Sequence, residues 1–357
     1  MKYLIVQDWS NTHGNHAGMV HMCKLLKEKY SNDYQYLVMK EPKRFRNLKG
    51  LGGILKRIWN HFIGKRWYYN YKFPHDYLKL CQPMFEKLKD GDEVFLLEYL
   101  LPWAPQYKLA TYIKKHYPFV KLYALSHLTV KFFDEVITKE DKNIIEKWSQ
   151  PIDKMLTLGS SLSRYLCEHG VEKNKVSTGF HYVDADYYYK KEERIVHKPL
   201  RIIAMGNLQR DYSLLANVVK ETPNVHYIIC HGRTSVGNLF DGCNNVELKG
   251  YLSEDELKHQ MDIADVSINI MEDTIGSNVI TTSLAMGLAM VVSDVGSIRD
   301  YCNNDNAIFC ENKQDSFIKA INMLAQDSQR VSEMKEYSLE KSKKLHIEKI
   351  NEWLKIL

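Results

Sequence analysis

Residues 267–294, "SINIMEDTIGSNVITTSLAMGLAMVVSD", place a Gly-Ser-Asn turn between an apolar run and a stretch of small residues. Gly276 permits a tight backbone turn, and Ser277 or Asn278 is a good N-cap for a helix that runs to about Met286. Such a strand-turn-helix aims free backbone N–H groups and the positive end of the helix dipole at one point, which suits a diphosphate. The alternative is an ordinary helix cap in an α/β domain.

A second segment favours the anion-binding interpretation. In "AMGNLQRDYSLL" (204–215) a strand ends in a turn at Gly206 and Asn207, and Arg210 lies near the start of the next helix. A guanidinium beside a second helix N-terminus would neutralise the same diphosphate as it departs as a leaving group. Alone, Arg210 would equally fit a solvated surface position; two convergent features favour a binding role.

A histidine follows an internal strand in the first half of the chain. In "YALSHLTV", His127 comes just beyond the strand, where a neutral imidazole could hydrogen-bond a sugar hydroxyl or a reacting centre. The alternative is that it is one of fourteen histidines satisfied at a surface.

Other chemistries are disfavoured by missing motifs. No GxGxxG follows a strand, and no GxSxG elbow or Walker loop occurs, so a dinucleotide oxidoreductase is not expected. The DxD triplets at 90–92 and 184–186 are short enough to arise by chance, and the seven scattered cysteines form no CxxC pair. We therefore expect no metal site and no cofactor.

These residues need strands and helices to position them. An apolar strand at 2–7 is followed by a glycine-containing loop, "DWSNTHGNHAG", and a helical pattern. The same order of strand, loop and helix recurs along the chain. A second series begins at 199–207, after a charged connector. Alternating strands and helices predict an α/β protein with two Rossmann-like doubly wound domains, 1–190 and 191–335, whose ligand loops face a cleft between them. Residues 336–357 read as amphipathic helix.

The charge is unevenly distributed. The chain has 357 residues, is 45% hydrophobic and carries a net charge of +5, but residues 1–188 are +9 and residues 189–357 are −4. Segment 43–72 holds nine Lys or Arg residues, no acid and many aromatics, which suits an anionic membrane surface or a polyanionic partner. The alternative is a packed helical insertion with solvated charges. No window reaches eighteen apolar residues and no signal peptide is recognised, so we expect a cytoplasmic protein, placed by this segment at the inner face of the membrane.

Taken in order, these segments resemble the GT-B glycosyltransferases, specifically the retaining, metal-independent family 4 type. The similar passages are "NTHGNHAG", His127, "LTLGSSLSRYLCEHGVEKNKVSTGFHYVDADYY", "GNLQRDYSLL", "KGYLSEDELKHQMDIADVSINI" and "SLAMGLAMVVSDVGS". The resemblance implies sugar transfer from a nucleoside diphosphate sugar, with Arg210 and the residues from Gly276 to Val279 on the diphosphate, a turn at Gly250 and Tyr251 near the base, and His127 by the donor sugar. The loop with Gly14 is assigned to the donor site as well. The C-terminal helix is expected to cross back to the first domain.

The sequence departs from this family at its paired glutamates, which would fall on Thr274 and Thr282. Thr282, or Thr281, could still hydrogen-bond a ribose hydroxyl, though without charge assistance. Glu272 or Asp273 could take over the sugar contact if the loop shifts by one or two residues. Either the donor is held differently or catalysis is impaired.

Three functions follow from these observations. The first is a glycosyltransferase for surface polysaccharide, acting on a glycan or lipid-linked acceptor. The second is a nucleotide-sugar epimerase on the same fold. The third is a non-catalytic GT-B partner or glycan-binding subunit, which the two threonines favour. Nucleic acid is not an expected partner.

Overall fold

The computed structural model describes residues 1–8, 15–40, 71–102, 104–139, 141, 143–189 and 195–357. Gly14 and most of segment 43–72 lie outside the described residues. The chain divides into two compact units: the first contains Met1–Leu128, Phe132–Thr157 and Ser163–Thr178, and the second contains Thr129–Lys131, Leu158–Leu162 and Gly179–Leu357.

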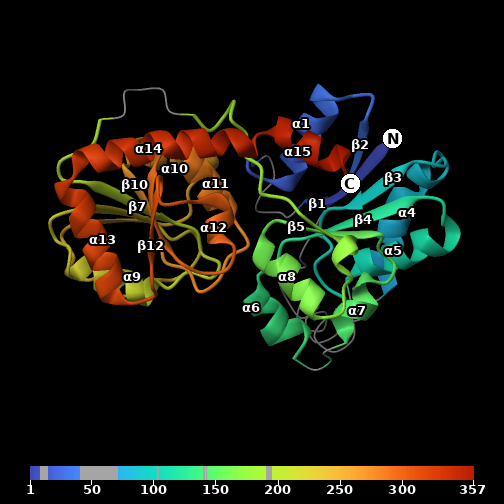
Figure 1. The fold of residues 1–357 in the computed structure, drawn as a ribbon, viewed down its shortest axis with the longest axis horizontal. Helices are drawn as coiled ribbons and strands as arrows, with labels where there is room; N and C mark the ends of the chain where they lie inside the picture. Colours follow the sequence, from blue (N-terminus) through green and yellow to red (C-terminus); the bar gives the residue numbers. More distant parts are fainter. Residues whose placement is uncertain (9–14, 41–70, 103, 140, 142, 190–194) are drawn as a thin grey trace, which may run out of the picture. The chain divides into compact units, whose positions relative to one another are not determined.

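The first unit is built on a six-stranded parallel sheet in the order β2-β1-β3-β4-β5-β6 (Figure 1). Its strands are β1 (Lys2–Asp8), β2 (Tyr34–Lys40), β3 (Glu93–Leu96), β4 (Lys121–Ser126), β5 (Lys154–Thr157) and β6 (Val176–Thr178). The helices that alternate with these strands are α1 (Met19–Lys29), α4 (Phe73–Phe85), α5 (Pro105–His116), α6 (Val130–Phe132), η3 (Phe133–Ile137), α7 (Ile144–Ser149), α8 (Ser160–Glu168) and η4 (Lys173–Lys175). Residues 130–131 of α6 and 160–162 of α8 fall in segments that group with the second unit.

The second unit has its own six-stranded parallel sheet, in the order β12-β11-β10-β7-β8-β9. Its strands are β7 (Arg201–Met205), β8 (His226–Cys230), β9 (Val246–Lys249), β10 (Val266–Asn269), β11 (Ala289–Ser293) and β12 (Ala307–Cys310). The helices are α9 (Tyr212–Lys220), α10 (Glu254–Asp262), α11 (Asn278–Ala285), α12 (Ile298–Tyr301), α13 (Gln314–Gln326), α14 (Ser328–Ser342), η5 (Lys343–Leu345) and α15 (Ile347–Lys355).

Burial explains why these segments form parallel strands. The central strands read as near-continuous apolar runs rather than alternating ones, as in β1 and β11, where Leu4, Val6, Val291 and Val292 are fully buried. Strands of that kind are stable only where helices cover both faces of the sheet. The two parallel sheets with surrounding helices confirm the doubly wound α/β architecture that the sequence predicts.

The C-terminal helices pack on the start of the second unit. The backbone N–H of Val183 donates to the carbonyl of Leu345 (2.9 Å), and the rings of Phe180 and Trp353 lie 6.3 Å apart. Helix α14 runs through residue 335, where the sequence sets a domain boundary. The boundaries at 190 and 335 and the crossing of the last helix stay predictions. Among the described residues, none of the helices combines the length and the apolar character that crossing a bilayer requires.

Candidate functional site

Two loops meet at the carboxyl edge of the second sheet. One follows β7 (206–211) and the other follows β10 (270–277), and β7 and β10 are neighbouring parallel strands. The backbone N–H of Asp211 donates to the carbonyl of Ile270 (3.2 Å), and that of Glu272 donates to the carbonyl of Gln209 (3.0 Å). The loops are therefore fastened to each other at the edge where ligands bind in doubly wound domains.

Gly206, Arg210 and Val279 come together at these loops, although they are far apart in sequence. Gly206 has a φ of +89°, and a Cβ there would lie 3.2 Å from Val279 Cγ2 and 3.5 Å from Arg210 Nε. A side chain at Gly206 would therefore separate the guanidinium from the start of helix α11. The turn at Gly206 and the residues around Gly276, predicted separately from the sequence, lie side by side in one unit.

Arg210 is held by neutral groups. Its Nε donates to the carbonyl of Met205 (3.1 Å), and its Nη2 donates to Oδ1 of Asn269 (3.4 Å). Desolvation by burial lowers the pKa of Arg210 to about 10, so the guanidinium stays charged at neutral pH. No carboxylate forms an ion pair with it among the described residues. Its charge is therefore left to attract an anion.

Helix α11 begins as the sequence predicts. Ser277 is the N-cap in an extended conformation, and its Oγ accepts a hydrogen bond from the N–H of Ile280 (3.4 Å). The first turn carries no acidic side chain that would compete for its N–H groups. The Oδ1 atom of Asn278 is buried and has no hydrogen-bond partner among the described residues. The helix thus presents an uncompensated positive end beside Arg210.

Gly276, immediately before this N-cap, adopts a φ of +92°, and a Cβ there would overlap the buried ring of Tyr301. Gly276→Ala is therefore expected to lower the free energy of unfolding by about 2–5 kcal/mol, since left-handed strain and overpacking add. Gly232→Ala is the matched control, because Gly232 has a φ of +62° and open space around it. Chemical denaturation of both variants measures the difference, and equal losses would rule out the overlap with Tyr301.

The two threonines at the expected glutamate positions are buried and hydrogen-bonded locally. Thr274 Oγ1 accepts from the N–H of Gly276 (3.1 Å), and Thr282 Oγ1 donates to the carbonyl of Asn278 (2.6 Å), four residues earlier. Thr274 thus supports the turn before the helix, whereas the bond of Thr282 to the carbonyl four residues earlier satisfies its hydroxyl without stabilising the helix. The predicted ribose contact of Thr282 stays a prediction, and it would require this hydroxyl to accept, rather than donate, a hydrogen bond.

The neighbouring carboxylates also have partners. Asp273 Oδ1 accepts from the N–H of Thr274 (2.7 Å), Asp273 Oδ2 accepts from the N–H of Lys131 (2.9 Å), and the Lys131 ammonium pairs with Glu272. Lys131 belongs to the segment that groups with the second unit. The sequence did not point to this lysine. The sugar contacts predicted for Glu272 and Asp273 stay predictions.

The remaining predicted residues of the second unit, Asn207 and Tyr251, are exposed. Tyr251 keeps 60% of its surface, and the guanidinium of Arg233 lies 4.8 Å from its ring centroid, a cation–π contact. An exposed aromatic ring with a cation over it can stack against a planar base.

His127 lies in the first unit, directly after β4. Its Nε2 is 2.7 Å from Oε2 of Glu98, a carboxylate that is 3% exposed. Sequence reasoning missed Glu98, although a single acid within the apolar run "VFLLEYL" (94–100) was a signal that could have found it.

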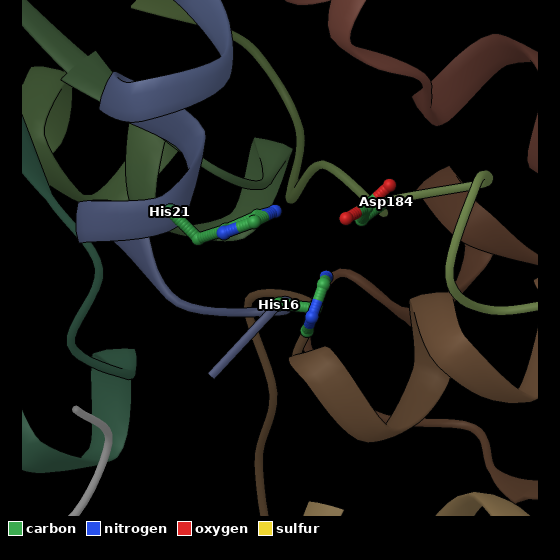
Figure 2. Close-up of side chains that lie close together, drawn as sticks. All are labelled: His16, His21 and Asp184. Carbon is green, nitrogen blue, oxygen red and sulfur yellow. The ribbon is translucent and has the colours of Figure 1, made fainter. Parts of the chain in front are cut away.

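Two histidines adjoin helix α1. Figure 2 shows His16, before the helix, and His21, within it, and their ring centroids are 4.3 Å apart. Asp184, drawn in the same view, belongs to the second unit. Within the described part of the chain, neither unit by itself gathers three metal-ligating side chains. Metal independence stays an expectation.

The two parallel sheets define the chain as a protein of the GT-B glycosyltransferase fold. Sucrose-phosphate synthase from Thermosynechococcus elongatus is similar with a TM-score of 0.72 and 9% identity, over 100% of this chain and 97% of that chain. HepE (Alr3699) of Anabaena in complex with UDP is similar with a TM-score of 0.69 and 13% identity, over 100% of both chains. The apo form of the lipopolysaccharide outer core galactosyltransferase WaaB is similar with a TM-score of 0.63 and 13% identity, over 99% of both chains.

Part of the second unit matches a family model. Residues 199–327 match the model of the glycosyl transferases group 1 family. A search of curated protein sequences returns no match. The predicted GT-B fold and group 1 resemblance are thus confirmed, whereas the assignment to family 4 stays a prediction.

Proposed function

We propose that this protein is a glycosyltransferase that moves a sugar from a nucleoside diphosphate sugar to a glycan or lipid-linked acceptor in surface polysaccharide synthesis. Retention at the anomeric carbon and independence of metal are part of the proposal. The match of residues 199–327 to the group 1 family supports sugar transfer. The observation that carries it is Arg210, a partly desolvated guanidinium beside the N-terminus of α11 that has no carboxylate partner in the described part of the chain.

The chemistry follows from these charges. When the bond between the anomeric carbon and the diphosphate oxygen breaks, negative charge develops on the leaving diphosphate. In the proposed mechanism, Arg210 and the backbone N–H groups at Ser277, Asn278 and Val279 stabilise that charge. Because the site supplies this positive charge from the chain itself, departure of the diphosphate needs no bridging cation in the proposed mechanism.

The choice of donor can start from one comparison. HepE, which shares the fold, has been solved with UDP and with UDP-glucose. We therefore place UDP-sugars first in a panel of nucleotide sugars incubated with this protein. The exposed ring of Tyr251 and the guanidinium of Arg233 are our proposed contacts of the base.

The panel also separates the three candidate functions. Release of nucleoside diphosphate with a glycoside product, or slow release to water, supports the transferase. Isomerisation of the sugar without release of the diphosphate would instead identify the protein as an epimerase. If no donor is turned over, and none binds in isothermal titration calorimetry, the non-catalytic subunit is the function that remains.

Segment 43–72 is our proposed contact with anionic lipid or a polyanionic acceptor, because it holds nine basic residues and no acid. Changing Lys56, Arg57, Lys65 and Arg66 together to Ser should abolish sedimentation with vesicles that contain anionic lipid. Neutral vesicles are the control for lipid charge. Unchanged binding by the fourfold variant would remove the membrane contact from the proposal.

A further inference from the structure

The pair formed by Glu98 and His127 is placed by the fold of the first unit. Glu98 follows β3 and His127 follows β4, and these neighbouring strands run in parallel with Leu96 opposite Ala124. Both residues therefore emerge at the same carboxyl edge. The Glu98 carboxylate is 3% exposed, whereas the His127 side chain keeps 24% of its surface. A buried acid thus supports a ring that reaches the surface of the unit.

Within the described residues, His127 is the group that pairs with the buried Glu98 carboxylate. Among the described residues, two further titratable groups respond to the charge of the Glu98 carboxylate, the thiol of Cys23 on α1 and the phenol of Tyr77 on α4. Desolvation raises the pKa of both well above the usual range, so both are neutral and neither supplies positive charge. A buried carboxylate left without a cation costs several kcal/mol, which favours the protonated form of the ring.

Two opposing effects act on the ring. Burial by itself would lower the pKa of His127, but the charge and hydrogen bond of Glu98, with a hydrogen bond to the residue's own backbone, more than offset this. The pKa of His127 is therefore raised above its ordinary value. The sequence suggested a neutral imidazole here; the buried carboxylate favours the charged form.

We propose that Glu98 is a positioning residue that fixes the orientation of the His127 ring and holds it protonated, so that a cationic ring contacts an oxygen of the transferred sugar. The last step rests on the proposed glycosyltransferase function. The pairing itself does not, since it depends only on residues of the first unit. A cationic donor binds an oxygen acceptor about twice as strongly as a neutral one.

The pairing is tested by NMR on ¹⁵N-histidine-labelled full-length protein, with His127→Gln to assign the resonances. In the wild-type protein His127 should titrate above the model-peptide value of about 6.5. In Glu98→Gln its pKa should fall, because burial remains and the carboxylate charge is gone. Glu86→Gln, an exposed residue after α4, is the matched control and should leave the titration unchanged.

A wild-type pKa at or below 6.5, or an unchanged pKa in Glu98→Gln, would overturn the inference. The wild-type measurement keeps the test decisive even if Glu98→Gln fails to fold. Neither readout requires sugar transfer, so failure of the proposed function is seen separately, in the donor panel.

Where transfer is observed, the pH profile gives a second readout. The alkaline limb of kcat should move to lower pH in Glu98→Gln, and a pKa lowered by one unit would reduce kcat about tenfold at pH values above both. A purely structural role would instead lower kcat equally at every pH. That second pattern would contradict the positioning role.

Discussion

Arg210→Ala is expected to reduce kcat/KM for the nucleotide-sugar donor by about two orders of magnitude, the scale of one electrostatic contact to a leaving group. The reason is the charge balance around this side chain. Its partners are the carbonyl of Met205 and the amide of Asn269, both neutral, so its positive charge is available to the diphosphate. Steady-state kinetics with the donor found in the panel measure the effect.

Two further variants make this test specific. Arg210→Lys keeps the positive charge but loses the planar guanidinium. Its kcat/KM should lie between those of the wild type and Arg210→Ala. Arg164→Ala removes an exposed arginine of α8 and should leave kcat/KM unchanged. If Arg210→Ala were as active as the wild type, Arg210 would have no place in the site.

Lys335→Met is expected to lower the free energy of unfolding of the second unit by about 3–5 kcal/mol. The Lys335 ammonium lies 3.0 Å from Oδ1 of Asp265, and both side chains are 0% exposed. Asp265 precedes β10, whereas Lys335 lies on α14, so the pair ties a late helix to the central strand of the sheet. The variant leaves a buried carboxylate without its cation. Chemical denaturation followed by circular dichroism measures the loss.

The controls separate buried charge from lost packing. Lys343→Met removes one partner of an exposed pair with Glu340 and should cost about 0–1 kcal/mol. Asp265→Asn combined with Lys335→Met removes both charges and should recover part of the loss. Full recovery is not expected, since Asp265 also accepts from the N–H groups of His197 and Arg201. A small effect of Lys335→Met would show that the ring of His197, whose Nδ1 lies 3.0 Å from Oδ2 of Asp265, is a sufficient partner for this carboxylate.

The architecture could be predicted from the sequence because a parallel sheet has a distinct pattern of apolar residues. Strands buried on both faces must be apolar throughout, and this pattern located β1, β7, β10 and β11 from their letters alone. The N-cap of α11 was predicted to within one residue, Ser277 or Asn278, since a short polar side chain after a glycine is a local signal, and the structure places it at Ser277. The ends of the strands could not be predicted in the same way. The apolar run from residue 94 continues to residue 100, but β3 ends at Leu96.

The partners of the side chains could not be predicted in this way. Such contacts join residues that are far apart in the sequence. Examples are the hydrogen bond of Arg210 to Asn269 and the contacts of Lys131 with Asp273 and Glu272. The hydroxyls of Thr274 and Thr282 likewise turn to nearby backbone, a choice of rotamer that spacing does not encode. The sequence predicted which loops would carry the site, but not which atoms within them would remain available.

The backbone hydrogen bonds between the loops after β7 and β10 have a consequence for engineering this protein. Because Asp211 bonds to Ile270 and Glu272 bonds to Gln209, a loop transplanted alone from another enzyme would meet a partner shaped for a different backbone. The pair is the smallest transferable module at this edge of the sheet. Libraries that seek a new donor preference should therefore vary both loops together, and changes made in the two are expected to be non-additive.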